Sequence, residues 1–522
     1  MTAVDQKRIA ANTILLYVRM LVVMVVNLYT SRVVIDALGQ EYYGIFDAVG
    51  GIVLLVSFLT GPMSTACQRY YSYELELNNS DNLKRVFNIS LTIFFILTMA
   101  IILLAETAGY WFLMHKTDVN GHYYAAKWVF QFSIISFALY IVRVPYQGMI
   151  ISREKMKVFA YLSLFEAFAT LGIAFVLIKT PDDKDNRLII YAGLRLGIQF
   201  ITTLFHWLYC RLYYKECRFK LVFDKTKFKE MFSYSSWNMI GASADVFKNI
   251  GLNALLNVFF GPIISAARAI ANKVQMTITQ LNINVFTAVR PQIYKSYTAN
   301  EINDMHKLVC QSSRFSFYLL FVVALPLLLE TEFILPLWLR GRNVPDYAYI
   351  LTRLMIIDAL VNSLSSPLSA PVQATGNIRR FQLVVGTTML TILPLSYVAV
   401  KFLEMPPETV FYISIIVSFL SQMLRMWFVY RQTGLRMSVY ITKAVLPIIL
   451  VTIISTALSL LSKNLLMSSD WHNQTLLSLS VMALSIIITS VTAYFAGITS
   501  SERRNGWKMV KERLSIFYAH SK

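Results

Sequence analysis

The chain has 522 residues, of which 56% are hydrophobic and only 15% are charged, and its formal net charge at pH 7 is +19. A soluble fold could not bury so much apolar surface, so the composition excludes a soluble globular protein and predicts a helical protein that crosses a bilayer many times. A large positive charge is also typical of nucleic-acid-binding proteins, but here it follows the connecting segments. We therefore expect no nucleic-acid partner.

Apolar runs such as ISLTIFFILTMAIILLA (89–105) and LSLSVMALSIIITSVTAYFAG (477–497) are long enough to cross a bilayer as α-helices. The whole pattern predicts about fourteen spans. In chain order they lie near 9–38, 43–68, 86–114, 123–150, 158–179, 188–210, 231–260, 262–294, 312–335, 347–373, 381–402, 409–430, 442–462 and 475–500.

Most Lys and Arg residues outside the spans fall in alternate connecting segments, above all between Arg211 and Lys229 and from Arg503 to Lys522. The positive-inside rule predicts that these segments, including Lys307 and Arg314, and both termini lie in the cytoplasm. The first apolar segment is too long, and too often interrupted by polar residues, for a cleavable signal peptide.

The sequence matches itself at an offset of about 222 residues, the sign of an internal repeat. The matched positions include Gly39 with Gly261, Pro145 with Pro367, and Phe159 with Phe381. We predict two six-helix lobes, 1–220 and 221–440, followed by two additional helices in 441–500 and a basic tail, 501–522. Lobes with an even number of spans share one orientation and can rock about a central cavity, which favours a transporter over a duplicated scaffold without a cavity.

Basic residues also fall within the predicted spans or at their ends. They are Arg19, Arg32, Arg69, Arg143, Arg195, Lys248, Arg268, Lys273, Arg290, Lys295, Arg353 and Arg425. The acids in the same spans are fewer, namely Asp36, Asp47, Glu106, Glu166, Asp245 and Asp358. A charge that faces lipid costs at least about 2.5 kcal/mol, so we expect many of these side chains to line a cavity. The excess of basic residues predicts a cationic interior and an anionic cargo.

Position along a span separates these residues. Arg32, Lys295, Arg353 and Arg425 lie close enough to span ends for their side chains to reach the interface. Arg19 lies too deep for that, which favours a cavity role.

Alternatives stay open for the others. Lys248 is one turn after Asp245, so the two could simply pair with each other. Arg143 could satisfy carbonyls exposed near Pro145. Either Arg195 pairs with Glu166 or it faces the cavity, and one of Arg268 and Lys273 is expected to face it.

No signature of an enzyme is present: the chain has no P-loop, no nucleophile-elbow serine and no long extracytoplasmic loop. The four cysteines, Cys67, Cys210, Cys217 and Cys310, show neither a disulfide framework nor metal-ligand spacing. We expect no enzymatic activity, no metal and no cofactor. Transport would then be driven by an ion gradient (Na⁺ or H⁺), the membrane potential or the cargo's own gradient.

Three stretches resemble a known family: NTILLYVRMLVVMVVNLYTSRVVIDALGQEYYGIFD (12–47), PLWLRGRNVPDYA (336–348) and VQATGNIRRFQ (372–382). They are similar to Wzx-type polysaccharide (O-antigen) flippases, which belong to the multidrug/oligosaccharidyl-lipid/polysaccharide (MOP) exporter superfamily. The resemblance covers essentially the whole chain, but its motifs are diffuse and do not identify the glycan.

The resemblance implies a V-shaped pair of lobes that works by alternating access. The cargo would be an undecaprenyl-diphosphate-linked oligosaccharide for O-antigen, capsule or exopolysaccharide, moved from the cytoplasmic to the periplasmic leaflet of a bacterial inner membrane. Its partners would be this lipid-linked glycan, membrane lipids and other polysaccharide-assembly proteins, and the chain is expected to be a monomer. In relatives that have them, the two additional helices help to accommodate the lipid tail.

Matching positions in the family make Arg19, Arg69 and Arg290 the best lumen candidates, because arginine binds phosphate oxygens bidentately. Further candidates are Arg143, Lys248 and Arg268, with Asp47 and Asp245 as coupling or pairing acids. The phrases TACQR and TAVRPQ place Arg69 and Arg290 at related points of each repeat, one residue out of register, which predicts a related pair near the cytoplasmic mouth.

Two other functions compete with the flippase. A multidrug and toxin extrusion (MATE) antiporter of the same superfamily would need carboxylates in its first lobe, where this chain has Arg19. A membrane O-antigen polymerase or ligase would need sizeable periplasmic loops, and the longest expected here has only about a dozen residues.

Overall fold

Helices are the only regular secondary structure in the described part of the chain. The structure, a computed structural model, describes residues 3–39, 42, 45–46, 49, 60–116, 122–180, 183–220, 224–339, 344–345, 347–467, 474–500 and 502–504. Among these residues, eleven helices are long and apolar enough to cross a membrane. The chain is therefore a multi-pass membrane protein, and the predicted all-α class is confirmed.

The helices follow the predicted spans closely. In chain order they are α1 (Ala3–Leu38), α3 (Thr60–Glu76), α4 (Ser80–Leu104), η2 (Ala105–Gly109), α5 (Tyr110–Lys116), α6 (Tyr123–Ser152), α7 (Met156–Ile178), α8 (Lys184–Tyr213), η3 (Lys215–Cys217), α9 (Lys225–Thr298), α10 (Ile302–Leu329), α11 (Thr331–Trp338), α12 (Ala348–Asn362), α13 (Ser365–Thr375), α14 (Arg379–Leu390), α15 (Ile392–Lys401), α16 (Thr409–Thr433), α17 (Met437–Tyr440), η4 (Ile441–Val445), α18 (Leu446–Met467), α19 (Gln474–Thr492) and η5 (Ala493–Gly497). The span expected near 43–68 falls mainly on residues outside the described ranges.

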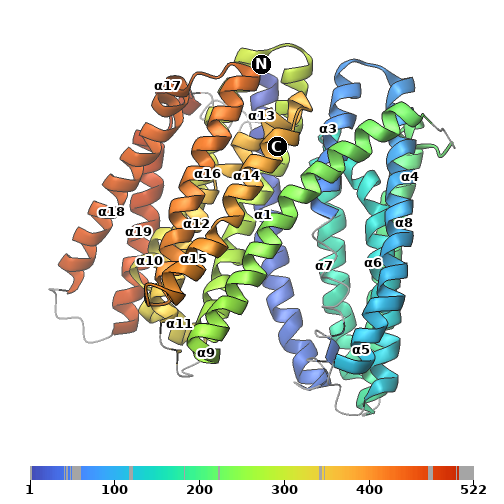
Figure 1. The fold of residues 1–522 in the computed structure, drawn as a ribbon, viewed down its shortest axis with the longest axis horizontal. Helices are drawn as coiled ribbons and strands as arrows, with labels where there is room; N and C mark the ends of the chain where they lie inside the picture. Colours follow the sequence, from blue (N-terminus) through green and yellow to red (C-terminus); the bar gives the residue numbers. More distant parts are fainter. Residues whose placement is uncertain are drawn as a thin grey trace, which may run out of the picture. The chain divides into compact units, whose positions relative to one another are not determined.

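The chain separates into two compact units. The N-unit is Asn12–Ala242, and the C-unit is Met1–Ala11 together with Ser243–Lys522. Figure 1 shows helices running side by side within each unit. Each unit is described by itself below, and the expected lobe boundaries at residues 220 and 440 stay predictions.

The N-unit is built around α6. This helix packs against α3, α4, α7 and α8, and α7 also packs against α8. Its apolar side chains Val129, Phe130 and Ile141 are fully buried, so they form the centre of the bundle. Removing these side chains from water and lipid fixes how α6 is rotated, and this rotation decides which way its polar residues point.

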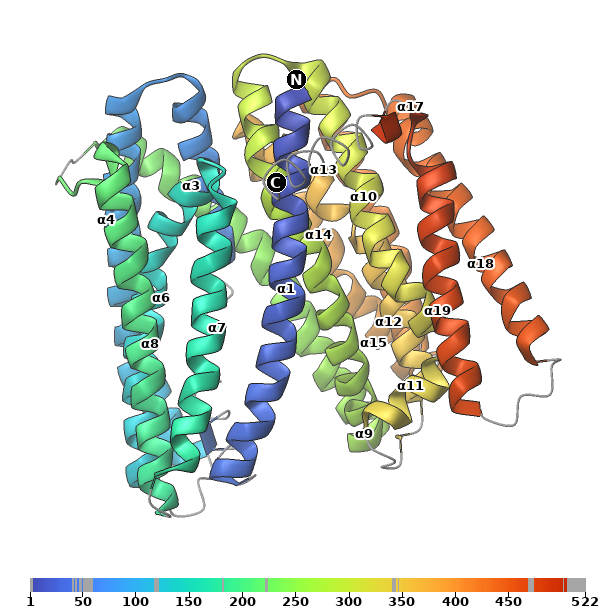
Figure 2. The same cartoon turned by 180° about the vertical axis from the view of Figure 1, so that it is seen from behind.

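The C-unit contains the two additional helices. Figure 2 shows α19 between α10 and α18, and α10 packs against both of them. Ion pairs lie at both ends of this contact: Lys463 Nζ is 3.0 Å from Glu330 Oε1, and Arg314 Nη2 is 2.6 Å from Glu502 Oε1. Arg314, which was expected on the cytoplasmic side, is a buried residue of α10, and its guanidinium donates to Glu502 and to the Gly497 carbonyl. Glu502 belongs to the tail that was also expected in the cytoplasm, so the side of the membrane on which Arg314 lies stays a prediction.

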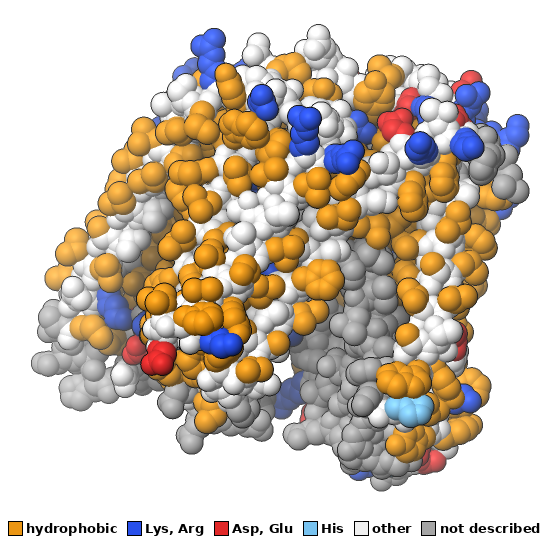
Figure 3. All heavy atoms as spheres, in the orientation of Figure 1, with side chains coloured by type: hydrophobic (Ala, Val, Ile, Leu, Met, Phe, Trp, Pro, Cys, Tyr) orange, Lys and Arg blue, Asp and Glu red, His pale blue; other side chains and the backbone are white. Residues whose placement is uncertain are grey.

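Charge and hydrophobicity also separate on the surface of the C-unit. On the face drawn in Figure 3, hydrophobic side chains cover the middle of the unit, while Lys and Arg gather at the upper end near α17. Arg431, Arg436 and Lys443, which flank or follow α17, are exposed. The exposed apolar band fits the hydrocarbon layer, and the basic end fits a membrane-water interface.

The expected spans near 231–260 and 262–294 both lie in α9, which turns at Gly261. Gly261 has φ of 80° and ψ of −175°, a combination that is essentially restricted to glycine because a Cβ would strain the backbone. One glycine therefore allows two antiparallel spans to follow each other with almost no loop.

Replacing Gly261 by alanine is expected to destabilise the protein by about 1–3 kcal/mol through backbone strain. The added methyl group would meet nothing within 4 Å, so a steric clash does not contribute. The matched control is Gly172→Ala in α7, where a methyl group also meets nothing within 4 Å and the backbone is helical. Thermal unfolding of the purified protein in detergent measures both variants, and equal stability would contradict the prediction.

Candidate functional site

One face of α7 carries a line of polar and aromatic side chains that the other helices of the N-unit contact. Phe159, Ser163, Glu166 and Thr170 are spaced by four, three and four residues. At about 100° per residue this spacing places them within roughly 60° of arc. We name these four residues the α7 stripe.

The large aromatic side chains that are exposed on α7 lie on the other side of the helix. These aromatic side chains are Tyr161, Phe165, Phe168 and Phe175. Their positions are roughly opposite the α7 stripe, so this apolar face suits lipid. The side chain of Glu166 is 38% exposed, and a charge facing lipid is unfavourable, so the open side of the α7 stripe suits water and not lipid.

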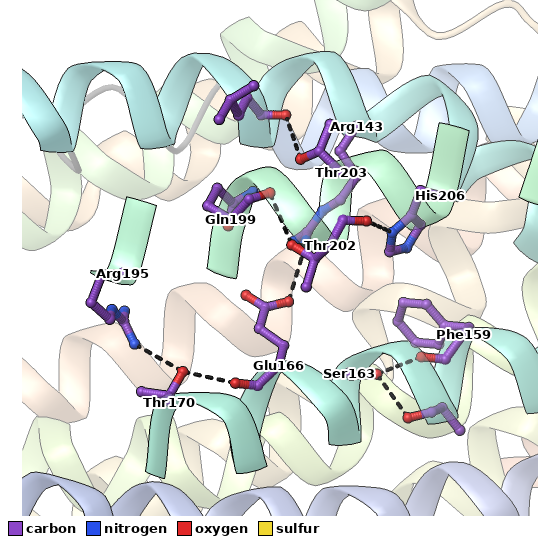
Figure 4. A network of polar contacts seen from close by, with 12 residues as sticks. Arg143, Phe159, Ser163, Glu166, Thr170, Arg195, Gln199, Thr202, Thr203 and His206 are labelled. Carbon is purple, nitrogen blue, oxygen red and sulfur yellow. Dashed lines mark hydrogen bonds and ion pairs between the residues drawn. The ribbon is translucent and has the colours of Figure 1, made fainter. Parts of the chain in front are cut away.

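Arg143 of α6 contacts the centre of the α7 stripe (Figure 4). Its Nη1 donates to Glu166 Oε2 at 3.0 Å and to Thr202 Oγ1 of α8 at 3.2 Å. Its guanidinium carbon also lies 5.1 Å from the centroid of the Tyr140 ring. One alternative was that Arg143 satisfies carbonyls exposed near Pro145. α6 stays helical through Pro145, and Arg143 instead bonds to side chains on two neighbouring helices.

Arg19 of α1 contacts the same face one turn away. Its Nη1 donates to Ser163 Oγ at 3.0 Å, and its guanidinium carbon lies 4.8 Å from the centroid of the Phe159 ring. Arg19 also interacts electrostatically with Glu166. The position of Arg19 in the first span therefore places its charge on the α7 stripe.

Arg195 of α8 reaches the other end of the α7 stripe. Its Nη1 donates to Thr170 Oγ1 at 3.4 Å, and the residue is exposed (Figure 4). The sequence left open whether Arg195 pairs with Glu166. In the structure Arg143 makes the ion pair with Glu166, and Arg195 contacts the threonine one turn further on.

The hydroxyl groups hold these arginines without cancelling their charge. Ser163 donates its own proton to the Phe159 carbonyl, Thr170 to the Glu166 carbonyl, and Thr202 to the Gln199 carbonyl. Each hydroxyl therefore offers a lone pair to a guanidinium group and carries no net charge.

The α7 stripe thus collects three arginines, from α1, α6 and α8, and one carboxylate. A buried histidine next to it, His206, has Nδ1 2.7 Å from the Thr202 carbonyl oxygen, which fixes the ring beside Arg143. The excess of guanidinium groups on one face makes this an anion-receptive surface, because the planar guanidinium group binds two oxygens of a phosphate or carboxylate at once.

Arg69, which the sequence places at the end of a helix, lies in the middle of α3 and in a different environment. Its guanidinium carbon is 4.7 Å from the centroid of the Tyr70 ring and 5.0 Å from that of Tyr234. Tyr70 in turn donates its hydroxyl to Glu230 at 3.1 Å. Arg69 is thus held by aromatic faces, and its expected relation to Arg290 across the repeat stays a prediction.

The C-unit candidates form local contacts. Lys248 Nζ lies 3.5 Å from Asp245, the pairing that its spacing allowed. Arg268 folds back across the turn of α9: Nη1 donates to Asn253 at 3.1 Å, and Nη2 donates to the Asn249 carbonyl at 3.2 Å. Of Arg268 and Lys273, the first is buried and the second is exposed.

Two more arginines of the C-unit contact neighbouring side chains. The Arg290 guanidinium lies 5.2 Å from the centroid of the Phe286 ring. Arg425, expected at the interface, donates to Ser369 at 2.7 Å and lies 5.7 Å from the centroid of the Phe381 ring. Asp47 falls outside the described residues.

One of the acids counted in the predicted spans, but not named as a coupling or pairing candidate, lies inside the C-unit. Asp358 of α12 is 8% exposed and accepts hydrogen bonds from Ser418 at 2.7 Å and from Gln275 at 3.3 Å. Close by, Gln422 donates to Ser365 at 2.7 Å. This is a carboxylate surrounded by neutral polar side chains. In the described part of the chain, no group of three or more His, Cys, Asp or Glu residues could hold a metal ion.

Comparison of sequences identifies no relative: no protein-family model and no curated protein matches the chain. Solved structures do match. A structure described as the outward-facing conformation of a multidrug resistance MATE family transporter of the MOP superfamily has a TM-score of 0.68 and 12% identity, over 84% of this chain and 99% of that one. The chain shares its fold.

Two further structures agree with this fold. The MATE transporter ClbM in complex with Rb⁺ has a TM-score of 0.67 and 16% identity, over 83% of this chain and 97% of that one. A MOP superfamily transporter from Pyrococcus furiosus has a TM-score of 0.67 and 12% identity, over 83% and 98%. Its description states that the reverse polarity of its binding pocket suggests a different function.

Proposed function

We propose that this chain is a membrane transporter that moves an undecaprenyl-diphosphate-linked oligosaccharide from the cytoplasmic to the periplasmic leaflet of a bacterial inner membrane. The observation that carries the proposal is the α7 stripe, where Arg19, Arg143 and Arg195 meet a single carboxylate. A diphosphate supplies several anionic oxygens, and guanidinium forks bind such oxygens with charge-assisted hydrogen bonds.

The fold supports a transporter and not an enzyme. The matching structures are described as transporters, and one of them has a binding pocket of reversed polarity. An anionic cargo requires a basic binding surface, and the α7 stripe with its three arginines meets this requirement. The glycan would be a repeat unit of O-antigen, capsule or exopolysaccharide, delivered to other assembly proteins by a monomeric transporter with both termini in the cytoplasm.

A MATE-type antiporter for cationic drugs is the second candidate. Its support is the similarity to MATE structures, one of them in complex with Rb⁺, and the carboxylate of Asp358 with its neutral oxygen-bearing neighbours. In either transporter Asp358 is the described carboxylate of the C-unit best placed to couple transport to Na⁺ or H⁺. The antiporter would replace the flippase if overexpression gave drug resistance that Asp47→Asn abolished, because cationic drugs need acids and not arginines.

The direct test is complementation. The full-length chain is expressed in strains that each lack a known flippase for O-antigen, capsule or exopolysaccharide, and surface polysaccharide is measured. We expect restoration in at least one strain and none with an empty vector. Absence of restoration in every strain, with the protein present in the membrane by immunoblot, would contradict the proposal.

A further inference from the structure

Glu166 occupies the position in the α7 stripe where an anionic group of the cargo would bind. Its Oε2 accepts from Arg143 Nη1 at 3.0 Å. The two side chains differ in exposure, 8% for Arg143 and 38% for Glu166, so the carboxylate covers the guanidinium from the open side. A ligand that approached from that side would meet Glu166 before it met Arg143.

The guanidinium of Arg143 is held independently of Glu166. Thr202 Oγ1 accepts from the same Nη1 at 3.2 Å, and the Tyr140 ring lies under the guanidinium at 5.1 Å. Thr202 is itself fixed by its hydrogen bond to the Gln199 carbonyl at 3.0 Å. Arg143 would therefore keep its place if the carboxylate moved away, and a preorganised cation binds an incoming anion without an ordering penalty.

The groups that surround Glu166 favour a replacement anion over an empty site. From α1, Arg19 interacts electrostatically with Glu166, and from α8 the neighbouring groups are Arg195, through Thr170, and His206. Removing the carboxylate from Arg143 without a substitute would leave three arginines on one face with no negative charge among them. Another anion can take the place of the Glu166 carboxylate at low cost, because without a negative charge the three arginines would repel one another in a partly buried site.

We propose that Glu166 is a resident counter-anion, which occupies Arg143 in the cargo-free protein and is displaced by the anionic group of the cargo. This inference rests on the proposed function and sharpens it, because it predicts which anion is selected. A group with several anionic oxygens, such as a diphosphate, contacts more than one arginine and displaces Glu166. A single sugar carboxylate offers no more than Glu166 already provides, so acidic sugars do not select the cargo.

The experiment is calorimetric titration of the purified full-length protein in detergent, at constant ionic strength, with inorganic pyrophosphate and with glucuronate. We expect the wild type to bind pyrophosphate and not glucuronate. Glu166→Gln removes the competing charge while keeping the shape, so its affinity for pyrophosphate should rise roughly tenfold to hundredfold, and it should gain binding of glucuronate.

Two further variants make the outcome specific to Arg143. In a protein that already carries Arg143→Gln, adding Glu166→Gln should raise the affinity for pyrophosphate little or not at all, because the guanidinium that Glu166 covers is absent. Glu332→Gln, which removes an exposed carboxylate partner of Arg353 in the C-unit, should leave both titrations unchanged. If Glu166→Gln does not fold, Glu166→Asp, with a shorter reach to Arg143, should show an intermediate gain in pyrophosphate affinity.

Unchanged or weaker pyrophosphate binding by Glu166→Gln, or an equal gain in the Arg143→Gln background, would overturn the inference. The proposed function fails separately. If surface polysaccharide is restored but Glu166→Gln leaves the affinity for pyrophosphate unchanged, only the proposal of a resident counter-anion is overturned. If complementation fails but Glu166→Gln raises the affinity for pyrophosphate, only the assignment of the cargo is overturned.

Discussion

Replacement of Arg143 by glutamine will abolish the restoration of surface polysaccharide by this chain. Arg143 is the arginine at the centre of the α7 stripe and the one that contacts both α7 and α8. Its loss removes a charge-assisted contact to the cargo, so we expect the affinity for the cargo to fall roughly tenfold to hundredfold. It also leaves Glu166 without its ion pair, at a cost on the order of 2 kcal/mol, since that carboxylate is partly exposed.

The measurement is complementation in the strain that the wild type restores, with immunoblots for the amount of protein in the membrane. Arg19→Ala, which removes the neighbouring cation of the α7 stripe, should reduce restoration, and so should Arg69→Ala if its predicted place at the cytoplasmic mouth is right. Arg353→Gln is the matched control, because Arg353 pairs with Glu332 on the exposed surface of the C-unit. Full restoration by both Arg143→Gln and Arg19→Ala would contradict the claim that the α7 stripe receives an anion. It would not contradict the proposal that the chain is a flippase.

Replacement of Arg314 by glutamine will have the largest effect on stability, about 3–5 kcal/mol, because it leaves a carboxylate buried without its partner. The side chains of Arg314 and Glu502 are only 6% and 15% exposed, and their closest atoms are 2.6 Å apart. The same guanidinium donates to the Gly497 carbonyl at 3.0 Å, so it joins the end of η5, the segment that follows α19, to α10.

Thermal unfolding in detergent tests this prediction. The double variant Arg314→Met with Glu502→Leu should recover much of the loss, because replacing both members of a buried ion pair by apolar groups is often neutral. Arg353→Gln, at an exposed ion pair, should change stability by less than about 1 kcal/mol. Equal stability of Arg314→Gln and Arg353→Gln would show that the contact between α10 and α19 does not depend on this ion pair.

The same contact has a pH dependence. Burial alone would raise the pKa of Glu502, but hydrogen bonds from Thr499 and Gln311 and the charge of Arg314 outweigh it and hold the pKa below its ordinary value of 4.5. A carboxyl with a lowered folded-state pKa stabilises the fold above its unfolded pKa and loses that contribution as the pH falls through the folded pKa. The contact is therefore complete at neutral pH, and its contribution falls only below about pH 4.5.

The sequence predicted the helical class because it depends on local features. Runs such as 89–105 leave no alternative to a spanning helix, and Gly261 lies between two predicted spans at the point where α9 turns. The three arginines that contact the α7 stripe were also accessible from sequence, since Arg19, Arg143 and Arg195 are charges inside apolar segments.

The contacts of those charges were not accessible, because they depend on how each helix is rotated. Arg143 could equally have satisfied carbonyls near Pro145, and only packing of α6 against α7 and α8 directs it to Glu166 and Thr202. Packing also gives Arg425 a serine partner where the sequence suggested a residue at the interface. The burial of Arg314 was not accessible for the same reason, since its partner Glu502 lies 188 residues away in the sequence.

The neutral residues of the site were missed because they carry no charge signal. Ser163, Thr170 and Thr202 look like ordinary polar residues of a spanning helix. The available signal was the spacing of Ser163, Glu166 and Thr170, which puts a carboxylate and two hydroxyls on one face of α7 opposite its exposed aromatic residues.

Translocation in proteoliposomes tests most directly whether the α7 stripe carries an anionic cargo. The purified protein is reconstituted, and movement of a fluorescent undecaprenyl-diphosphate-linked oligosaccharide between leaflets is followed for the wild type and for a variant with glutamine at positions 19, 143 and 195. We predict that the wild type moves the lipid and that the variant, reconstituted at the same density, is slower by at least tenfold, roughly the value of one lost charge-assisted contact. Equal rates for the two proteins would contradict the claim that these arginines receive the cargo.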